Sequence, residues 1–306
     1  MSLSQQLKDQ TAAVMFQSHK FGVRKKVDAP TRAQAARPFS ADPTAIAVSK
    51  NLLDTRSQAF ADVTAVIIRA RRYWKSMTVF FPVRGTRLIH RDRMTDFDIQ
   101  MKRFRDELES AVQDLLGQYK ELKKDARQKL GQLYSPSDYP TPDTLVDEFK
   151  IEWSYPAVDP PNYLKQPNPR LYEQEQARVA ARFEEAMAAA QQTLAAELQQ
   201  LLAHLVDRLT PNESGRRRSL SPKAIEGLKD FVERFQQLGI HTSGELDSMV
   251  RSIQEIAQGV DVASLRQHPE QQAQLFTDVT AAKQAIDELL VDAPDRKITL
   301  DDDDEP

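Results

Sequence analysis

The chain has 306 residues, no cysteine and a formal net charge of −3. The lack of cysteine excludes disulfides, thiolate metal sites and a cysteine nucleophile, and it fits a reducing compartment, for which we expect the cytoplasm. No stretch has the roughly 18 apolar residues that a membrane-spanning helix needs, and residues 1–17 lack the apolar core of a signal peptide. We therefore expect a protein that neither crosses a membrane nor enters the secretory path.

The charges are unevenly distributed along the chain. Residues 1–93 carry 17 Lys or Arg against 6 Asp or Glu, a balance of +11, whereas residues 94–306 balance to −14. A basic end predicts an anionic partner, which is either nucleic acid or an acidic protein. The basic end could equally bind the acidic end of a second copy of the chain, so we also expect a homo-oligomer.

The composition favours long helices. Glycine is scarce, with 9 residues, whereas Ala, Gln, Leu, Glu, Lys and Arg are frequent, and this lowers the odds of many tight β-hairpins. We predict a mainly α fold, in which an elongated, antiparallel, coiled-coil-like helical hairpin is joined to a small helical bundle and a minor β element.

Residues 1–93 are predicted to form a basic N-terminal region with one long helix and one extended segment. The helix is expected over 43–75, because Phe60, Val63 and Ile67 recur on one face. The segment 78–90 is then extended. Residues around Phe16 also have the character of a strand.

The stretch 94–210 predicts the helical hairpin. Apolar residues recur at alternating steps of four and three from Phe97 to Leu133, with one extra residue near Gln118, and a second such seam runs from Val179 to Leu209. The crossover 134–169 between them holds eight prolines, and helix cannot persist there.

Within that crossover, residues 149–155 alternate apolar and polar side chains, as a half-buried strand does. Together with residues 13–27 they predict a small two-stranded element. The apolar seams are open to two interpretations. A seam is satisfied more often inside one chain, because two arms joined by one connection meet at high effective concentration, yet the same stripe can form a dimer.

The C-terminal part predicts a linker, a bundle and a tail. Residues 211–222 include the basic run Arg216–Arg218 followed by Ser219, which is typical of a solvated connection and is alternatively a phosphate or phosphorylation site. Three amphipathic helices over 223–293 are expected to form a small bundle. The acidic residues in 294–306 predict a disordered tail.

Motifs of catalysis or metal binding are missing from the sequence. There is no phosphate-binding Gly loop, no pair of histidines at zinc-binding spacing and no Gly-flanked serine. The five histidines are widely scattered, whereas a metal or catalytic site needs groups that converge. We therefore predict a protein that is not an enzyme and that uses no cofactor or metal.

The segment 69–93 mixes basic and aromatic side chains. Guanidinium and ammonium groups neutralise phosphates while exposed rings stack on bases, so the mixture predicts a sequence-indifferent nucleic-acid groove. The alternative, which the alternation of apolar and basic residues favours, is that the rings belong to the core and the basic groups extend from it or pair with the acidic C-terminal part of the chain. The candidate nucleic-acid or anion-binding residues are Arg69, Arg71, Arg72, Trp74, Lys75, Arg84, Arg87, Arg91 and Arg93.

Four short blocks carry a resemblance to a known family. They are Phe21-Gly-Val-Arg-Lys-Lys26, Phe81-Pro-Val-Arg-Gly-Thr-Arg-Leu88, Asp138-Tyr-Pro140 and Val291-Asp-Ala-Pro-Asp-Arg-Lys-Ile298. The chain resembles a family of phage, plasmid and bacterial proteins of unknown function, often encoded near MoxR-type AAA+ ATPases and von Willebrand A-domain proteins. The resemblance implies an AAA+ ATPase and an A-domain protein as partners, and an origin in a phage or mobile element. It implies no reaction.

Two functions follow from the sequence. The first is a non-enzymatic helical adaptor or scaffold that binds protein partners through its helical arm and its basic N-terminal region. The alternative is a nucleic-acid-binding protein that uses residues 69–93.

Overall fold

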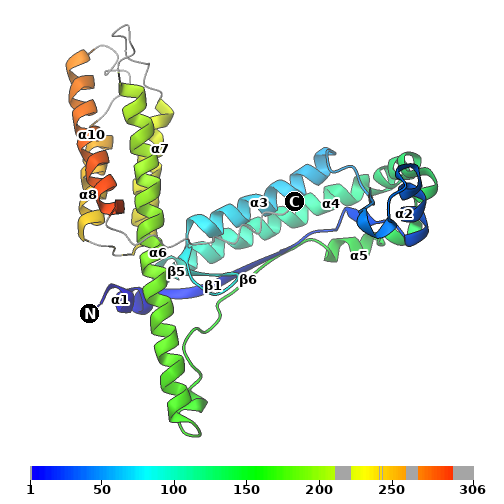
Figure 1. Cartoon of the computed structure of the whole chain (residues 1–306), viewed down its shortest axis with the longest axis horizontal. Coiled ribbons are helices and arrows are strands. Elements are labelled where there is room, and N and C mark those ends of the chain that lie inside the picture. Colours follow the sequence, from blue (N-terminus) through cyan, green and yellow to red (C-terminus); the bar gives the residue numbers. More distant parts are fainter. Residues whose placement is uncertain (1, 211–221, 241, 243, 260–267, 292–306) are drawn as a thin grey trace. The chain divides into compact units, whose positions relative to one another are not determined.

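The computed structural model describes residues 2–210, 222–240, 242, 244–259 and 268–291 (Figure 1). It is mainly helical, with a small antiparallel sheet. The chain divides into two compact units. Unit 1 comprises Met1–Val14, Lys75–Met94 and Tyr155–Pro306, and unit 2 comprises Met15–Trp74 and Thr95–Ser154.

Unit 1 is a helical bundle built on the 41-residue helix α6 (Pro169–Leu209). α6 packs against α1 (Leu3–Gln10), α7 (Pro222–Leu238) and α10 (Pro269–Val291), and α8 (Gly244–Gln258) packs against α7 and α10. The three predicted C-terminal helices are therefore present, and α6 joins them as a fourth.

Local sequence signals set the limits of these helices. The Asn168 side chain accepts a hydrogen bond from the backbone N–H of Leu171, and Pro169 occupies the first turn of α6, where its missing N–H has no cost. After α7, Gly239 adopts a positive φ of 61°, the left-handed conformation that commonly ends a helix.

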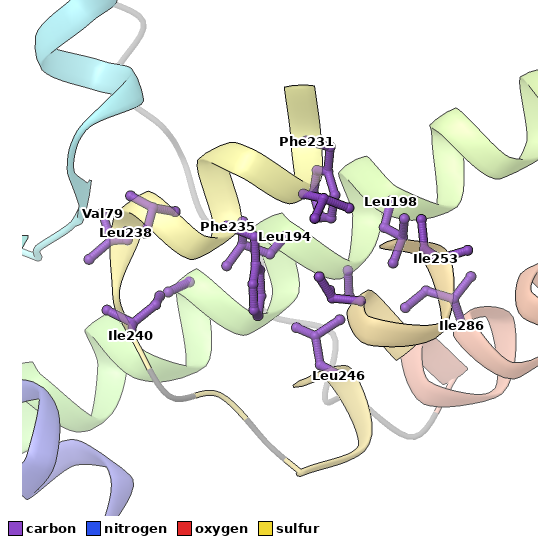
Figure 2. Packing of buried hydrophobic residues seen from close by; sticks show 14 of the residues in the cluster. Val79, Leu194, Leu198, Phe231, Phe235, Leu238, Ile240, Leu246, Ile253 and Ile286 are labelled. Carbon is purple, nitrogen blue, oxygen red and sulfur yellow. The ribbon is translucent and has the colours of Figure 1, made fainter. Parts of the chain in front are cut away.

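The core of unit 1 lies between α6, α7, α8 and α10. Figure 2 shows Leu194 and Leu198 of α6 turned toward the apolar side chains of the other helices. Leu198, Leu246 and Ile286 are fully buried. The predicted apolar stripe of α6 is therefore present. Other helices of unit 1 pack against it and bury it.

In unit 2, α3 (Gln58–Ser76) and the 37-residue α4 (Met94–Leu130) are the two long helices. Tyr73 of α3 stacks on Phe97 of α4, with ring centroids 5.7 Å apart, and lies 5.8 Å from the Phe104 ring. The other elements of unit 2 are α2 (Ala29–Ala36), α5 (Pro142–Asp147), β2 (Arg24–Lys26), β3 (Ser49–Asn51) and β6 (Lys150–Ser154).

The predicted pairing of the two seams as a coiled-coil hairpin is not confirmed. Both helices form close to their expected positions, but α4 belongs to unit 2 and α6 to unit 1. The buried face of α4 meets Tyr73 of α3, and that of α6 meets the C-terminal helices. A heptad pattern records which face of a helix is apolar, and it does not record which element covers that face.

The helix expected over 43–75 begins only at Gln58. Asp42 caps a single 3-10 turn, Pro43–Ala45, and residues Ser49–Asn51 form β3 instead of helix. The boundary was wrong because the turn and the strand pairing with β2 satisfy backbone groups that a longer helix would have used.

A four-stranded sheet has the strand order β4-β5-β1-β6. β1 (Thr11–His19) pairs antiparallel with β6, from Met15 opposite Ser154 to His19 opposite Lys150. This pairing confirms the strand predictions near Phe16 and over 149–155. The extended segment predicted over 78–90 forms the hairpin of β4 (Val79–Phe80) and β5 (Thr86–His90).

The compact units do not follow the consecutive ranges 1–93, 94–210 and 223–293 expected from the sequence. Each unit combines segments that are distant in the chain. The predicted linker with Arg216–Arg218, except for Pro222, and the acidic tail 294–306 lie outside the described residues. None of the helices in the described ranges is long and apolar enough to span a membrane.

Candidate functional site

The nine candidate residues of segment 69–93 are divided between the two units. Arg69, Arg71, Arg72 and Trp74 belong to unit 2, and the remaining five belong to unit 1.

In unit 2, the candidate residues on α3 are largely engaged with the protein itself. Trp74 is only 8% exposed and stacks on Phe16, with ring centroids 5.5 Å apart, so its ring is part of the core. The Arg71 guanidinium donates from Nη2 to Ser18 Oγ at 3.0 Å. Arg69 Nη2 lies 2.7 Å from Glu107 Oε2. Arg72 is exposed.

In unit 1, Arg87 is held by the β4–β5 hairpin. Its Nε donates to Thr78 Oγ1 at 2.7 Å and its Nη2 donates to the Thr78 carbonyl at 3.0 Å. Burial lowers the pKa of Arg87 to about 10. Arg91 Nε donates to the Thr11 carbonyl at 3.1 Å. Of the other three, Lys75 and Arg84 are exposed and Arg93 is half-buried.

Two rings of the segment, those of Trp74 and Phe81, belong to the core, as the second interpretation expects. Trp74 and Phe81 are buried, and Phe81 packs on Phe183 with ring centroids 5.1 Å apart. Arg71, Arg87 and Arg91 bond to the protein. The exposed basic groups that remain are not accompanied by exposed rings.

A different basic surface lies on unit 2, in the part formed by residues 20–57 and 117–140, which we call the basic end. It holds 13 Lys or Arg against 6 Asp or Glu. Its frame is the ribbon of β2 and β3, in which Lys25 lies opposite Lys50. Further contacts join the two segments, including a hydrogen bond from Lys50 Nζ to the Leu133 carbonyl at 2.7 Å and one from Tyr139 Oη to the Leu52 carbonyl at 2.8 Å.

Two carboxylates of the basic end, those of Asp138 and Asp54, form ion pairs with basic side chains of the same surface. The Asp138 side chain is 5% exposed, and its two oxygens lie 2.6 Å from Lys25 Nζ and 2.5 Å from Lys50 Nζ. Burial alone would raise the pKa of Asp138, but the hydrogen bonds from the two lysines outweigh it and hold that pKa below its usual value. Asp54 lies 3.0 Å from both Arg56 and Lys129.

Two further carboxylates cap backbone turns. The Asp28 side chain accepts from the backbone N–H of Thr31 at the start of α2, and Asp42 accepts from that of Thr44. Hydrogen bonds from the side chain and the backbone of Thr31 lower the pKa of Asp28, and those from the backbone and the side chain of Thr44 lower the pKa of Asp42. Four of the six carboxylates of the basic end, those of Asp28, Asp42, Asp54 and Asp138, are thus committed to internal contacts.

The opposite face of the ribbon is basic and exposed. Alternation along a strand places Arg24 and Lys26 on the face away from Lys25, and both are exposed. Arg24 Nε donates to Ser49 Oγ at 2.7 Å, across the ribbon. After α2, the chain presents Phe39, which is 80% exposed, beside the exposed Arg37.

Sequence reasoning did not select this surface. Its signals were the basic excess of residues 1–93 and two blocks of the family resemblance, Phe21–Lys26 and Asp138–Pro140. These blocks lie more than 100 positions apart, and the ion pair between Lys25 and Asp138 joins them. Only the folded chain shows that they form one surface.

A second feature of unit 2 is a hollow of about 380 Å³ beside β6. Arg105 of α4 lies over the Trp153 ring, 5.7 Å from its centroid, and Trp153 Nε1 donates to Asp98 Oδ1 at 2.9 Å. Hydrogen bonding from Lys102 is the largest cause of the lowered pKa of Asp98. The lining residues are Met15, Gln17, Arg105, Ile151, Glu152, Trp153 and Ser154.

Within the described ranges, no group of three or more His, Asp or Glu side chains is placed to hold a metal ion. Comparisons with family models, curated proteins and solved structures found no match to this chain.

Proposed function

We propose that the chain is a non-enzymatic helical adaptor, and that β6 accepts an extended segment of a partner protein. The observation that carries the proposal is the position of β6 as the outer strand of its sheet, beside the hollow lined by Arg105 and Trp153. An outer strand has backbone N–H and C=O groups on its outer side that can pair with an added strand.

The side chains beside this edge define the partner segment. The indole of Trp153 and the guanidinium above it form a flat surface that favours an apolar side chain, and Arg105 is exposed and favours a nearby carboxylate. The segment that fits best is therefore an extended peptide in which apolar and acidic residues alternate, because alternate side chains of an added strand point to the same face.

The family resemblance suggests who the partner is. We propose that it is a MoxR-type AAA+ ATPase or an A-domain protein of the kinds encoded near members of that family, in a phage or mobile-element system that acts in the cytoplasm.

The test is direct binding of the purified chain to each of these two proteins. We expect Arg105→Glu to weaken binding by about 30-fold, the effect typical of removing an interface arginine. Arg103→Glu is the matched control, because it makes the same charge change on an exposed position of α4 that does not line the hollow. A photo-crosslinker at Glu152 should react with the partner, and one at the exposed Glu109 should not.

Three results would overturn the proposal. The first is that neither protein binds. The second is that Arg105→Glu and Arg103→Glu weaken binding equally, and the third is that crosslinkers at Glu152 and Glu109 react equally with the partner. Light scattering tests a second copy as the occupant: a dimer that Arg105→Glu dissociates would assign β6 to self-association instead of partner binding.

A further inference from the structure

We propose that the basic end of unit 2 is a binding site for single-stranded nucleic acid, in which Arg24, Lys26 and Arg37 contact phosphates and Phe39 stacks on a base. The site differs in place and in residues from the segment 69–93 suggested by the sequence, and it does not depend on the proposed adaptor function at β6.

The first support is the electrostatic arrangement. Asp138 and Asp54 are held by lysine and arginine side chains, and Asp28 and Asp42 by backbone turns. Arg24 and Lys26 point to the opposite face of the ribbon from Asp138 and are exposed. These contacts remove four of the six carboxylates from competition, and Arg24 and Lys26 leave an outward positive face, as a polyanion requires.

The second support is the exposed ring of Phe39. The ring is 80% exposed, although an exposed apolar side chain of this size gains nothing from folding. A tight turn fixes its position: Ser40 has a φ of 50°, its N–H bonds to the Arg37 carbonyl at 3.0 Å, and the N–H of Ala41 bonds to the Ala36 carbonyl at 3.3 Å. A ring held outward beside an arginine is the element that stacks on bases in single-strand binding proteins.

The third support is the spacing. Arg24 and Lys26 are two residues apart on one strand face, about 7 Å. The eight-residue helix α2, about 12 Å long, follows β2 in the chain and leads to the turn that holds Phe39. A single strand a few nucleotides long can therefore reach from the ribbon to the ring.

These features favour a single strand over other polyanions. Bases in a duplex are stacked on one another and do not offer a free face to Phe39. An acidic peptide would pair with the basic groups but has no base to stack on the Phe39 ring. The combination of basic groups and a ring is what distinguishes the ligand.

The experiment is a fluorescence anisotropy titration of the full chain with labelled 20-nucleotide oligo-dT and oligo-rU, across a range of salt concentrations. Duplex DNA and poly-Glu serve as the competing ligand classes. We expect Phe39→Ala to weaken oligonucleotide binding about tenfold and to leave its salt dependence unchanged. We expect Arg24→Ala/Lys26→Ala to reduce the slope of log affinity against log salt by about 1.4, because each phosphate contact on a single strand contributes about 0.7.

Matched controls come from exposed residues elsewhere. Tyr163→Ala removes a ring that is 73% exposed in unit 1, and Arg72→Ala/Arg84→Ala removes two exposed charges of the segment 69–93. Neither control should change binding by more than about twofold. Circular dichroism should show that all variants fold, as expected for substitutions at exposed positions.

Several outcomes would overturn the inference. They are no binding of either oligonucleotide at 50 mM salt, a loss in Arg72→Ala/Arg84→Ala as large as in Arg24→Ala/Lys26→Ala, or Phe39→Ala binding as tightly as the unchanged chain. Duplex DNA or poly-Glu binding at least as tightly as the single strands would also reject it. The Arg105→Glu variant should bind oligonucleotides normally, so failure here is separable from failure of the adaptor proposal.

Discussion

Gly239→Ala should destabilise unit 1 by two separable effects. Gly239 follows α7 with a φ of 61°, and forcing alanine into left-handed backbone costs about 1–2 kcal/mol. An added Cβ would also lie 2.9 Å from Cδ2 and 3.1 Å from Cγ of His90. Overpacking of this kind costs about 1–3 kcal/mol, so we expect a total loss of about 3 kcal/mol.

A double-mutant cycle separates the two effects. In a His90→Ala background the ring is gone, so Gly239→Ala should cost only the backbone part, about 1–2 kcal/mol. Gly131→Ala offers a second comparison, because Gly131 has a φ of 51° and its added Cβ would meet nothing within 4 Å. Urea unfolding followed by circular dichroism measures each cost. Equal costs of Gly239→Ala in both backgrounds would refute the packing of His90 on this turn.

Two further substitutions test the cores and the basic end. Leu198→Ala, at a fully buried position of α6, should destabilise unit 1 by about 2–5 kcal/mol, whereas Leu171→Ala on the exposed start of α6 should cost less than about 0.5 kcal/mol; urea unfolding checks both. Asp138→Asn should destabilise unit 2 by about 2 kcal/mol, because it leaves Lys50 in a largely buried place without its counter-charge. Since the folded pKa of Asp138 is lowered, its stabilisation is complete above the unfolded value of about 4 and is lost as pH falls through the folded value. Thermal unfolding from pH 7 to pH 2 should therefore show a steeper loss for the unchanged chain than for Asp138→Asn.

Periodicity was enough to predict several of the individual elements. The apolar stripe from Val179 to Leu209 predicted α6, and the three C-terminal helices followed from their own amphipathic patterns. The alternation over 149–155 and near Phe16 predicted β6 and β1, which do pair. Each of these elements follows from the spacing of apolar residues within a short window, and this spacing can be read directly from the sequence.

The elements that cover the long helices could not be predicted in the same way. The stripes of α4 and α6 have matching heptads, but each is covered by elements of its own unit. The start of α3 was missed for a related reason, since pairing of β3 with β2 depends on residues 25 positions apart. Both errors concern long-range contacts that no single window of sequence contains.

The same limit explains why the sequence pointed to segment 69–93 and not to the basic end. From the sequence alone, a ring next to an arginine has the same appearance whether it faces the core or the solvent. The core takes Trp74 and Phe81, while a tight turn at Ser40 holds Phe39 outward. Exposure of the ring is therefore the property that separates a packing aromatic from a binding one, and Phe39→Ala measures its consequence: a loss of oligonucleotide affinity at unchanged salt dependence requires a stacked ring and is not produced by charge alone.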